Sequence, residues 1–332
     1  MRKLLRGLAT LLVLAAFLAL PYVFKNPYLL YVADTGLVYA LAVLGLVVLV
    51  GYAGLLSLGQ AAFYAVGAYT SGLLVVKLGV PVWAGILAAM LFSALWGVLV
   101  GLPSFKLEGP FLVIITIGFA EIVRLFVLNA QALTGGPFGL SQIKPLAIGS
   151  LALNTPQTFY YFILVLCLLV VAAVVRLRNS RVGQAMRAVR DDELAAGAMG
   201  INVQFYKVAA FAVSAMLAGL SGALYAHLTS YLNPDLFTFN TSANFLTMNV
   251  VGGIESVIGG VVSAVAVTLL PETLRFLKDY YMLIFSVILM LLVLFTAWLE
   301  NLRNSPDAGG ALGEWIRGLG SERRAQATSG RG

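Results

Sequence analysis

Long runs of apolar residues, separated by short polar segments, dominate this chain of 332 residues. A run of about 20 residues without charge has the length that crosses the hydrocarbon core of a bilayer as a helix. The pattern therefore predicts an all-α membrane protein with many spans. The uninterrupted runs lie near residues 8–24, 35–50, 61–78, 82–102, 111–128, 158–176, 207–229 and 281–299. The first is expected to be a retained span rather than a cleaved signal peptide, because bulky residues follow it.

The apolar interval 243–271 has a different pattern, because the stretch NVVGGIESVIGGVV places two glycine pairs and Glu255 inside it. One straight helix facing lipid is not expected there. We predict two shorter elements that meet near Gly252–Gly253, which gives about ten membrane elements, discontinuous half-helices included. Such breaks are tolerated where protein or a water-filled cavity covers the freed backbone groups. The alternative is one kinked helix, with the C-terminal tail on the opposite side.

Composition excludes a soluble domain, since 61% of the residues are hydrophobic, 11% are charged and the mean hydropathy is +0.95. The single cysteine excludes a disulfide framework, and the net charge of +7 first reports orientation rather than nucleic-acid binding. The N-terminus holds three Lys or Arg, Lys106 is one, residues 176–207 hold six and the tail after 300 holds five, which makes 15 of 21. The bias predicts that both termini and the 177–206 loop are cytoplasmic.

Charge is concentrated in the stretch RVGQAMRAVRDDELAAGAMG, residues 181–200. Asp191 or Asp192 is expected to cap a short helix over ELAAGAM, and Gly200 suits the left-handed residue that ends it. Asn202 is then expected to cap the helix that enters the next span. The pattern predicts a compact helix–turn–helix at the membrane face, of a kind that a soluble partner binds. A solvated basic loop is the alternative.

Four stretches together resemble the branched-chain amino acid permeases of ABC importers, of the LivM type. Residues 181–227 closely resemble the family's cytoplasmic coupling region and following helix. The stretches GYAGLLSLGQAAFYAVGAYTSGLL (51–74), GPFLVIITIGFAEIVRLFVLN (109–129) and LTGGPFGL (133–140) agree, in family order. The resemblance covers about residues 30 to 300. The chain departs from the family in two places. The family usually has a GGxGTxxGP pattern late in the chain, where this chain has GGIESVIGG. The family's usual basic and proline-containing ending after the last span is replaced here by a different sequence.

The resemblance implies a fold like that of type II ABC importer permeases. It implies a transmembrane permease domain over 1–302, with a coupling loop at 177–206, and a cytoplasmic tail over 303–332 that is expected to be disordered. The implied function is half of a translocation pathway for leucine, isoleucine, valine or related neutral amino acids, in the inner membrane of a bacterium or archaeon. The implied partners are a homologous LivH-like permease, two LivG/LivF-like ATPases and an extracytoplasmic amino-acid-binding protein.

The coupling loop looks like the family's site for docking on an ATPase. The chain has no GxxxxGK[ST] stretch, so ATP and Mg are expected on partner subunits and no cofactor or metal on this chain. The residues expected to serve the ATPase contact are Arg187, Arg190, Asp191, Asp192, Glu193, Ala195, Ala196 and Gly200.

Polar residues inside the spans are candidates for the translocation pathway. Glu121 and Arg124 are three positions apart on one helix face, so they are expected to neutralise each other and to face protein or a cavity. They are interpreted either as part of the pathway or as a pair that holds two helices together. Polar side chains after the Gly51–Gly54 break are either pathway groups or contacts between helices. The remaining candidates are Ser57, Gln60, Tyr64, Asn244, Asn249 and Glu255.

Other functions fit the sequence less well. A permease of the same family for urea or short amides stays open as an alternative. An ion-coupled secondary transporter would need coupled carboxylates in the spans and no docking loop. A membrane enzyme would need paired His, Asp or Cys residues, but the chain has one histidine and one cysteine. The chain is therefore predicted to be a transporter subunit and not an enzyme.

Overall fold

A computed structural model describes residues 26–105, 109–148, 151–152 and 155–274, with residues 15, 17–21 and 290–291. The chain divides into two units, 1–282 and 283–332, and only residues 290 and 291 are described in the second. The first unit contains all the elements discussed below. The predicted tail, nearly all of the last predicted span and most of the first lie outside the described residues.

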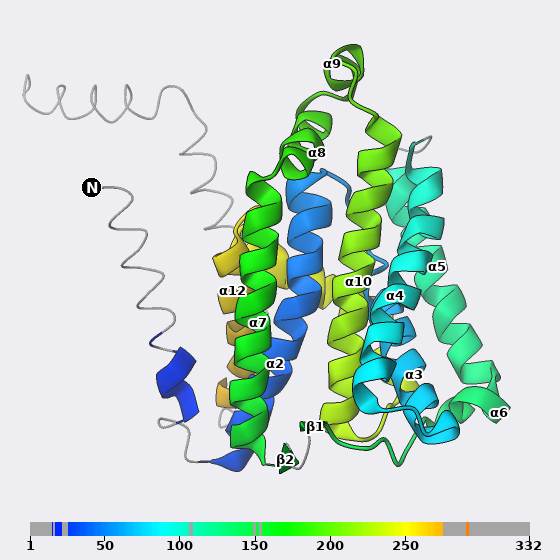
Figure 1. Cartoon of the computed structure of the whole chain (residues 1–332), viewed down its shortest axis with the longest axis vertical. Helices are drawn as coiled ribbons and strands as arrows, with labels where there is room; N and C mark the ends of the chain where they lie inside the picture. The colour runs from blue at the N-terminus through cyan, green and yellow to red at the C-terminus, as the bar shows by residue number, and fades with distance from the viewer. Residues whose placement is uncertain are drawn as a thin grey trace, which may run out of the picture. The chain divides into compact units, whose positions relative to one another are not determined.

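Helices make up nearly all of the described part of the chain (Figure 1). Among the described residues, six helical stretches are long and apolar enough to cross a membrane: α2 with the π-helical turn η1 (Pro27–Tyr52), α3 (Gln60–Leu78), α4 (Val82–Gly101), α5 (Pro110–Asn129), α7 (Pro156–Asn179) and α10 (Val203–Thr229). The shorter helices are α6 (Gln131–Thr134), α8 (Arg181–Asp191), α9 (Glu193–Ala198), α11 (Phe239–Gly252) and α12 (Val257–Leu274). Three 3-10 turns lie at Leu102–Phe105, Gly136–Phe138 and Pro234–Leu236. The strands β1 (Ala147–Ile148) and β2 (Leu151–Ala152) form a two-residue antiparallel pair. The all-helical, many-span prediction is confirmed, whereas the predicted count of about ten is not.

Helices α2 and α10 occupy the centre of the described fold. Helix α10 packs on α2, α3 and α4, and α2 packs in addition on α7 and α12. Ser221 of α10 donates a hydrogen bond to the carbonyl oxygen of Val38 on α2, at 2.6 Å. Hydroxyl groups of this kind hold helices together in a membrane, where the apolar surroundings favour no particular pairing.

The predicted break after α2 is present. Helix α2 ends in the turn η1 (Val47–Tyr52), and residues 53–59 then run back into the bundle before α3 begins. Gln60, the first residue of α3, donates to the carbonyl oxygen of Ala42, at 2.9 Å. Ala42 lies about ten residues before the end of this helical stretch, so α3 begins roughly 15 Å inside the bundle. Residues 53–59 are therefore a non-helical segment that is mostly buried in the bundle, with Gly54 and Leu56 exposed.

The predicted division near Gly252–Gly253 is present too. Helix α11 ends at Gly252, Gly253 has a φ of +88° and α12 begins at Val257. The 14 residues of α11 extend about 21 Å, less than the roughly 30 Å of a bilayer core. Ser263 of α12 donates back to the carbonyl oxygen of Met248 on α11, at 2.5 Å. The two helices therefore form a hairpin, and the alternative of a single kinked helix is wrong.

Helices α8 and α9 lie beyond the ends of α7 and α10, at the top of Figure 1, with β1 and β2 at the opposite end. Asp192 caps α9, because its Oδ1 accepts hydrogen bonds from the backbone N–H of Leu194 (2.9 Å) and Ala195 (3.0 Å). Gly200 has a φ of +82°. Asn202 caps α10 by accepting from the N–H of Phe205, at 3.1 Å. The predicted helix–turn–helix and its capping residues are confirmed.

Candidate functional site

Two charged side chains near the junction of α8 and α9, those of Arg190 and Glu193, point toward the rest of the chain. Arg190, at the end of α8, donates from Nη1 to the carboxylate of Glu255 and to the carbonyl oxygen of Gly51, both at 2.5 Å. It also donates to the Asp191 carboxylate, at 3.0 and 3.1 Å. Burial lowers the pKa of Arg190, but the hydrogen bonds with Glu255 and Asp191 outweigh it, so the pKa lies above its ordinary value. The guanidinium therefore stays charged and joins three segments of the chain.

A second ion pair lies two residues after the end of α8. Glu193 of α9 pairs with Lys207 of α10, with Oε1 and Nζ 2.5 Å apart, and the Lys207 side chain is only 1% exposed. A buried ammonium is stable where an opposite charge compensates for its lost hydration. Arg187 also connects the loop to the spans, because it donates a hydrogen bond to the carbonyl oxygen of Arg178 on α7, at 3.2 Å. The charges of the loop thus fix it to the helices beneath.

The outward side of α9 is apolar. Leu194 is 87% exposed and Met199 is 84% exposed, although both are large hydrophobic residues. Neither residue was predicted as a contact, because charge is the more conspicuous feature of this stretch in the sequence. Exposed apolar side chains on a small helical projection suit a contact with another protein.

The eight predicted contact residues of the loop divide into two groups. Asp191, Asp192, Ala195 and Gly200 are exposed, as a contact with a partner requires. For the other four, a contact with the ATPase stays a prediction. They are partly or fully buried because they contact this chain itself: Arg187, Arg190, Glu193 and Ala196.

Inside the bundle, polar side chains gather at the start of α3. Gln60 donates to the Ala42 carbonyl and accepts from the hydroxyl of Ser214 on α10, at 3.2 Å. Ser57 Oγ accepts from the N–H of Gly59, at 3.2 Å. Both predicted side chains are buried and bonded within the protein. The interpretation as a contact that holds helices together therefore accounts for the geometry of Gln60, whereas the bond of Ser57 is local to the segment before α3.

Side chains from two other helices complete this arrangement. Thr116 of α5 accepts a hydrogen bond from the N–H of Leu58, at 3.1 Å, and Ser242 of α11 accepts from the N–H of Ala61, at 3.0 Å. The first N–H groups of a helix have no partner within it, so a helix that starts inside a membrane needs such acceptors. Thr116 and Ser242 were not predicted, because nothing in their local sequence indicates which helix end they meet.

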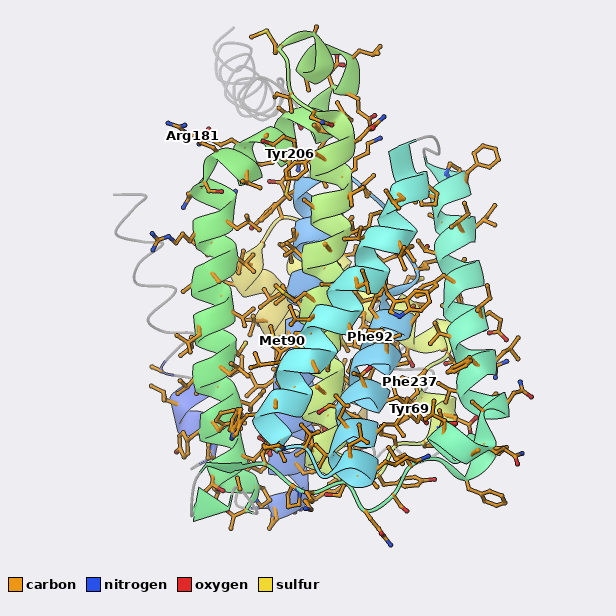
Figure 2. All side chains as sticks on the ribbon, turned by 45° about the vertical axis from the view of Figure 1, so that its right-hand side comes forward. Tyr69, Met90, Phe92, Arg181, Tyr206 and Phe237 are labelled. Carbon is orange, nitrogen blue, oxygen red and sulfur yellow. The ribbon has the colours of Figure 1, made fainter. Side chains whose placement is uncertain are left out.

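Tyr64, one turn further along α3, lies in a cluster of aromatic rings. Its ring centroid is 5.5 Å from that of Phe245 on α11, 5.7 Å from that of Tyr225 on α10 and 6.0 Å from that of Tyr39 on α2. The cluster continues toward the end of the bundle opposite α8 through Phe237 and Tyr69, which lie side by side in Figure 2. Four helices thus meet on apolar rings next to the start of α3.

The candidates of the α11–α12 region do not lie together. Asn249 is fully buried, and neither atom of its amide has a hydrogen-bond partner among the described residues. Asn244 is exposed. Glu255 lies at the α11–α12 turn and binds Arg190, at the α8 end of the bundle. These three residues therefore do not form one polar group.

Glu121 and Arg124 form the predicted pair, with the guanidinium Nη2 2.5 Å from the carboxylate. The Glu121 side chain is 49% exposed and that of Arg124 is 28% exposed, so the other described residues do not bury the pair. Its contact with other protein or with a cavity stays a prediction. Helix α5 uses the face of Leu112, Thr116 and Ala120 for its contact with the bundle, and this leaves Glu121 on its outer side.

Two buried polar groups of the spans were missed or undervalued. Asp34 of α2 is fully buried, although a single acid in an apolar run is a visible signal in the sequence. His227 hydrogen-bonds to Ser71 Oγ at 2.8 Å and to the carbonyl oxygen of Lys144 at 2.7 Å. It therefore ties the 130–148 segment to α3 and α10. Among the described residues no group of three His, Cys, Asp or Glu is placed to hold a metal ion.

Comparison with known proteins identifies relatives over most of the chain. A family described as branched-chain amino acid transport system / permease component matches residues 28–294. The high-affinity branched-chain amino acid transport system permease protein LivM of Escherichia coli K12 is 35% identical over 286 residues, which is 79% of this chain and 67% of that protein. The LivM protein of Salmonella typhimurium gives the same figures. The LivH permease of Salmonella typhimurium is 26% identical over 281 residues, 78% of this chain and 89% of that protein. No solved structure is a significant match.

Proposed function

This chain belongs to the family of branched-chain amino acid transport permeases, and on that premise we propose that it is a membrane-spanning subunit of an ATP-binding cassette importer. It forms half of a translocation pathway for leucine, isoleucine, valine or related neutral amino acids. ATP and Mg are bound by two ATPase subunits, and an extracytoplasmic binding protein delivers the substrate. The similarity to both LivM and LivH proteins supports a second, LivH-like permease as the other half.

The α8–α9 projection is the observation that carries this proposal. Its charged residues Arg190 and Glu193 bond to other segments of this chain, whereas the side chains of Leu194 and Met199 are exposed. A loop that only followed the positive-inside rule would have no reason to be capped, tied down and apolar at its tip. A rigid projection with an apolar tip is suited to transmit movement from an ATPase to the spans.

The exposed ion pair on α5 supports an assembly larger than this chain. Charged groups at membrane depth are costly toward lipid and are normally directed to protein or to water. Because Glu121 and Arg124 are partly exposed on this chain, we propose that their side of α5 faces the second permease or the pathway between the two. The charge bias of the sequence supports cytoplasmic termini and a cytoplasmic α8–α9 projection in the inner membrane.

Reconstitution tests the proposal. The chain is co-expressed with the permease, ATPase and binding-protein genes of its operon, purified, and sealed into vesicles. We expect ATP-dependent uptake of labelled leucine, isoleucine or valine that requires all the components and persists when ion gradients are collapsed. Uptake of urea or acetamide instead would select the amide alternative. Uptake by this chain alone, driven by an ion gradient, would exclude an ABC importer subunit.

A further inference from the structure

Three segments far apart in the sequence meet at the end of the bundle that carries α8. They are the end of the π-helical turn η1 at Gly51, the α11–α12 turn at residues 253–256, and the last turn of α8. The first two are the places where helices are interrupted inside the membrane domain. In transporters, interrupted helices form the substrate and ion sites around which the halves of the protein move during alternating access.

Glycines allow this close approach. A Cβ atom on Gly51 would lie 2.3 Å from the carbonyl oxygen of Ile254, and one on Gly54 would lie 2.5 Å from Cγ of Arg190. Both distances are shorter than any real contact of a Cβ atom. The η1 end, the α11–α12 turn and the Arg190 side chain are therefore packed directly on one another.

Arg190 is the residue that bonds to both interruptions. One nitrogen, Nη1, reaches the Gly51 carbonyl and the Glu255 carboxylate, both at 2.5 Å. Its other contacts are with Asp191 of its own helix, and the side chain is 26% exposed. A guanidinium has five donors in a fixed plane, so it serves several acceptors at once without moving.

The pair Glu193–Lys207 makes a parallel connection to α10. Glu193 is the first residue of α9, next to the corner that Asp192 caps. Lys207 is buried in α10, the helix that packs on α2, α3 and α4. Charged side chains at the corner between α8 and α9 thus bond to the η1 end, to the α11–α12 turn and to α10.

We propose that Arg190 is a positioning residue which transmits movement of the α8–α9 projection to the two interrupted segments, with Glu193–Lys207 as the link to α10. Arg190 and Glu193 then do not serve as contacts for the ATPase, a role that falls to the exposed face of α9. The inference rests on the proposed function, since it assigns a task to residues within that transporter. It predicts that loss of Arg190 separates ATPase binding from transport.

Arg190→Ala is the principal test, in the assembled transporter with its ATPases and binding protein. We expect the ATPase subunits to co-purify as with the unsubstituted chain and basal ATP hydrolysis to persist. Uptake, and stimulation of hydrolysis by loaded binding protein, should fall about tenfold or more, within the range of measured couplings between linked sites. Arg181→Glu is the matched control, because Arg181 lies on the same helix but points away from the bundle (Figure 2). It should transport normally.

Two further variants keep the test decisive if Arg190→Ala reduces the amount of protein. The exchange Arg190→Glu with Glu255→Arg restores one ion pair and should recover part of the uptake that Arg190→Glu alone loses. Arg190→Lys retains the charge but not the planar set of donors, so it should give an intermediate rate.

Labelling of the α11–α12 turn follows the transmission directly. Ser256→Cys, in a Cys167→Ala background, places a thiol on an exposed position of the turn. Its rate of modification by a maleimide should differ between the nucleotide-free and ATP-trapped transporter, and Arg190→Ala should abolish the difference. Normal stimulated uptake in Arg190→Ala, or detachment of the ATPases from it, would overturn the inference. Failure of the unsubstituted assembly to use ATP would instead overturn the proposed function.

Discussion

At the scale of single residues, buried polar side chains of the spans bond to groups on neighbouring helices. Gln60 illustrates this, because its amide both donates to Ala42 on α2 and accepts from Ser214 on α10. The amide is fully buried, so water does not replace either partner. Gln60 was predicted as a pathway candidate because it is polar within an apolar run. In the structure its amide connects α3 to α2 and α10.

Replacement of Gln60 by Ala should lower the stability of the purified protein. The substitution leaves a buried hydroxyl and a buried carbonyl with fewer partners, which costs about 1–3 kcal/mol. The midpoint of thermal unfolding in detergent measures the effect. Gln204→Ala is the control, because Gln204 is exposed at the start of α10, and its midpoint should be unchanged. Equal midpoints for both variants would contradict the role given to Gln60.

The pair on α5 makes a second prediction at this scale. If Glu121 and Arg124 neutralise each other at membrane depth, removal of either leaves the other charge uncompensated, whereas removal of both leaves none. Glu121→Gln with Arg124→Met should therefore insert and transport better than either single variant. Quantified membrane insertion and substrate uptake measure the coupling. Impairment equal to the sum of the single effects would show that the two residues act independently.

At the scale of elements, α9 depends on the residues that begin and end it. Asp192 accepts hydrogen bonds from two N–H groups at the start of α9, and Gly200, which follows the end of α9, has a φ of +82°. Apart from Gly200 and its chain neighbours, no atom of the described residues lies within 4 Å of the position of a Cβ on Gly200. The requirement for glycine there is therefore a matter of backbone conformation and not of space.

Gly200→Val should consequently impair coupling without disturbing the spans. A side chain in the left-handed region costs roughly 1–2 kcal/mol, and a branched one is among the least tolerated. We expect normal insertion but reduced uptake and weaker retention of the ATPases on purification. Gly197→Val is the control, since Gly197 also has no atom within 4 Å of its Cβ position but lies within α9. If both variants retain the ATPases and transport equally, the left-handed end of α9 is not needed.

At the scale of the whole molecule, the described helices separate two ends of the bundle. Helix α7, 24 residues long, connects the β1–β2 end to α8. A helix of this length extends about 36 Å, enough to cross the bilayer. We therefore expect positions on α8 and in the 130–148 segment to lie on opposite sides of the membrane.

Cysteine labelling in intact cells checks this arrangement and its orientation. In a Cys167→Ala background, Ser141→Cys should react with an impermeant maleimide from outside, because Ser141 is exposed at the end away from α8. Gln184→Cys on α8 should react only after the cells are permeabilised. The reverse pattern would invert the orientation, and labelling of both from outside would contradict the separation.

Several features followed from the sequence because they are local. Apolar runs of membrane length, the caps Asp192 and Asn202, and the left-handed Gly200 each depend on residues within a turn or two. The break at Gly252–Gly253 was predictable for the same reason, since two glycine pairs in an apolar run disfavour a continuous helix. The family resemblance rested on contiguous stretches, which the comparisons confirmed.

What only the tertiary structure decided is which distant groups meet. Arg190 and Glu255 are 65 positions apart and Gln60 and Ser214 are 154 apart, so no local pattern pairs them. From the sequence, Glu255 was predicted as a pathway residue and Arg190 as a residue of the ATPase-coupling loop, whereas packing brought the two together. The same holds for Glu121 and Arg124: their spacing determined that they pair, but the packing face of α5 determined that they lie on its outer side. Periodicity fixes the direction of a side chain relative to its own helix, and only the packing of the helices fixes what it touches.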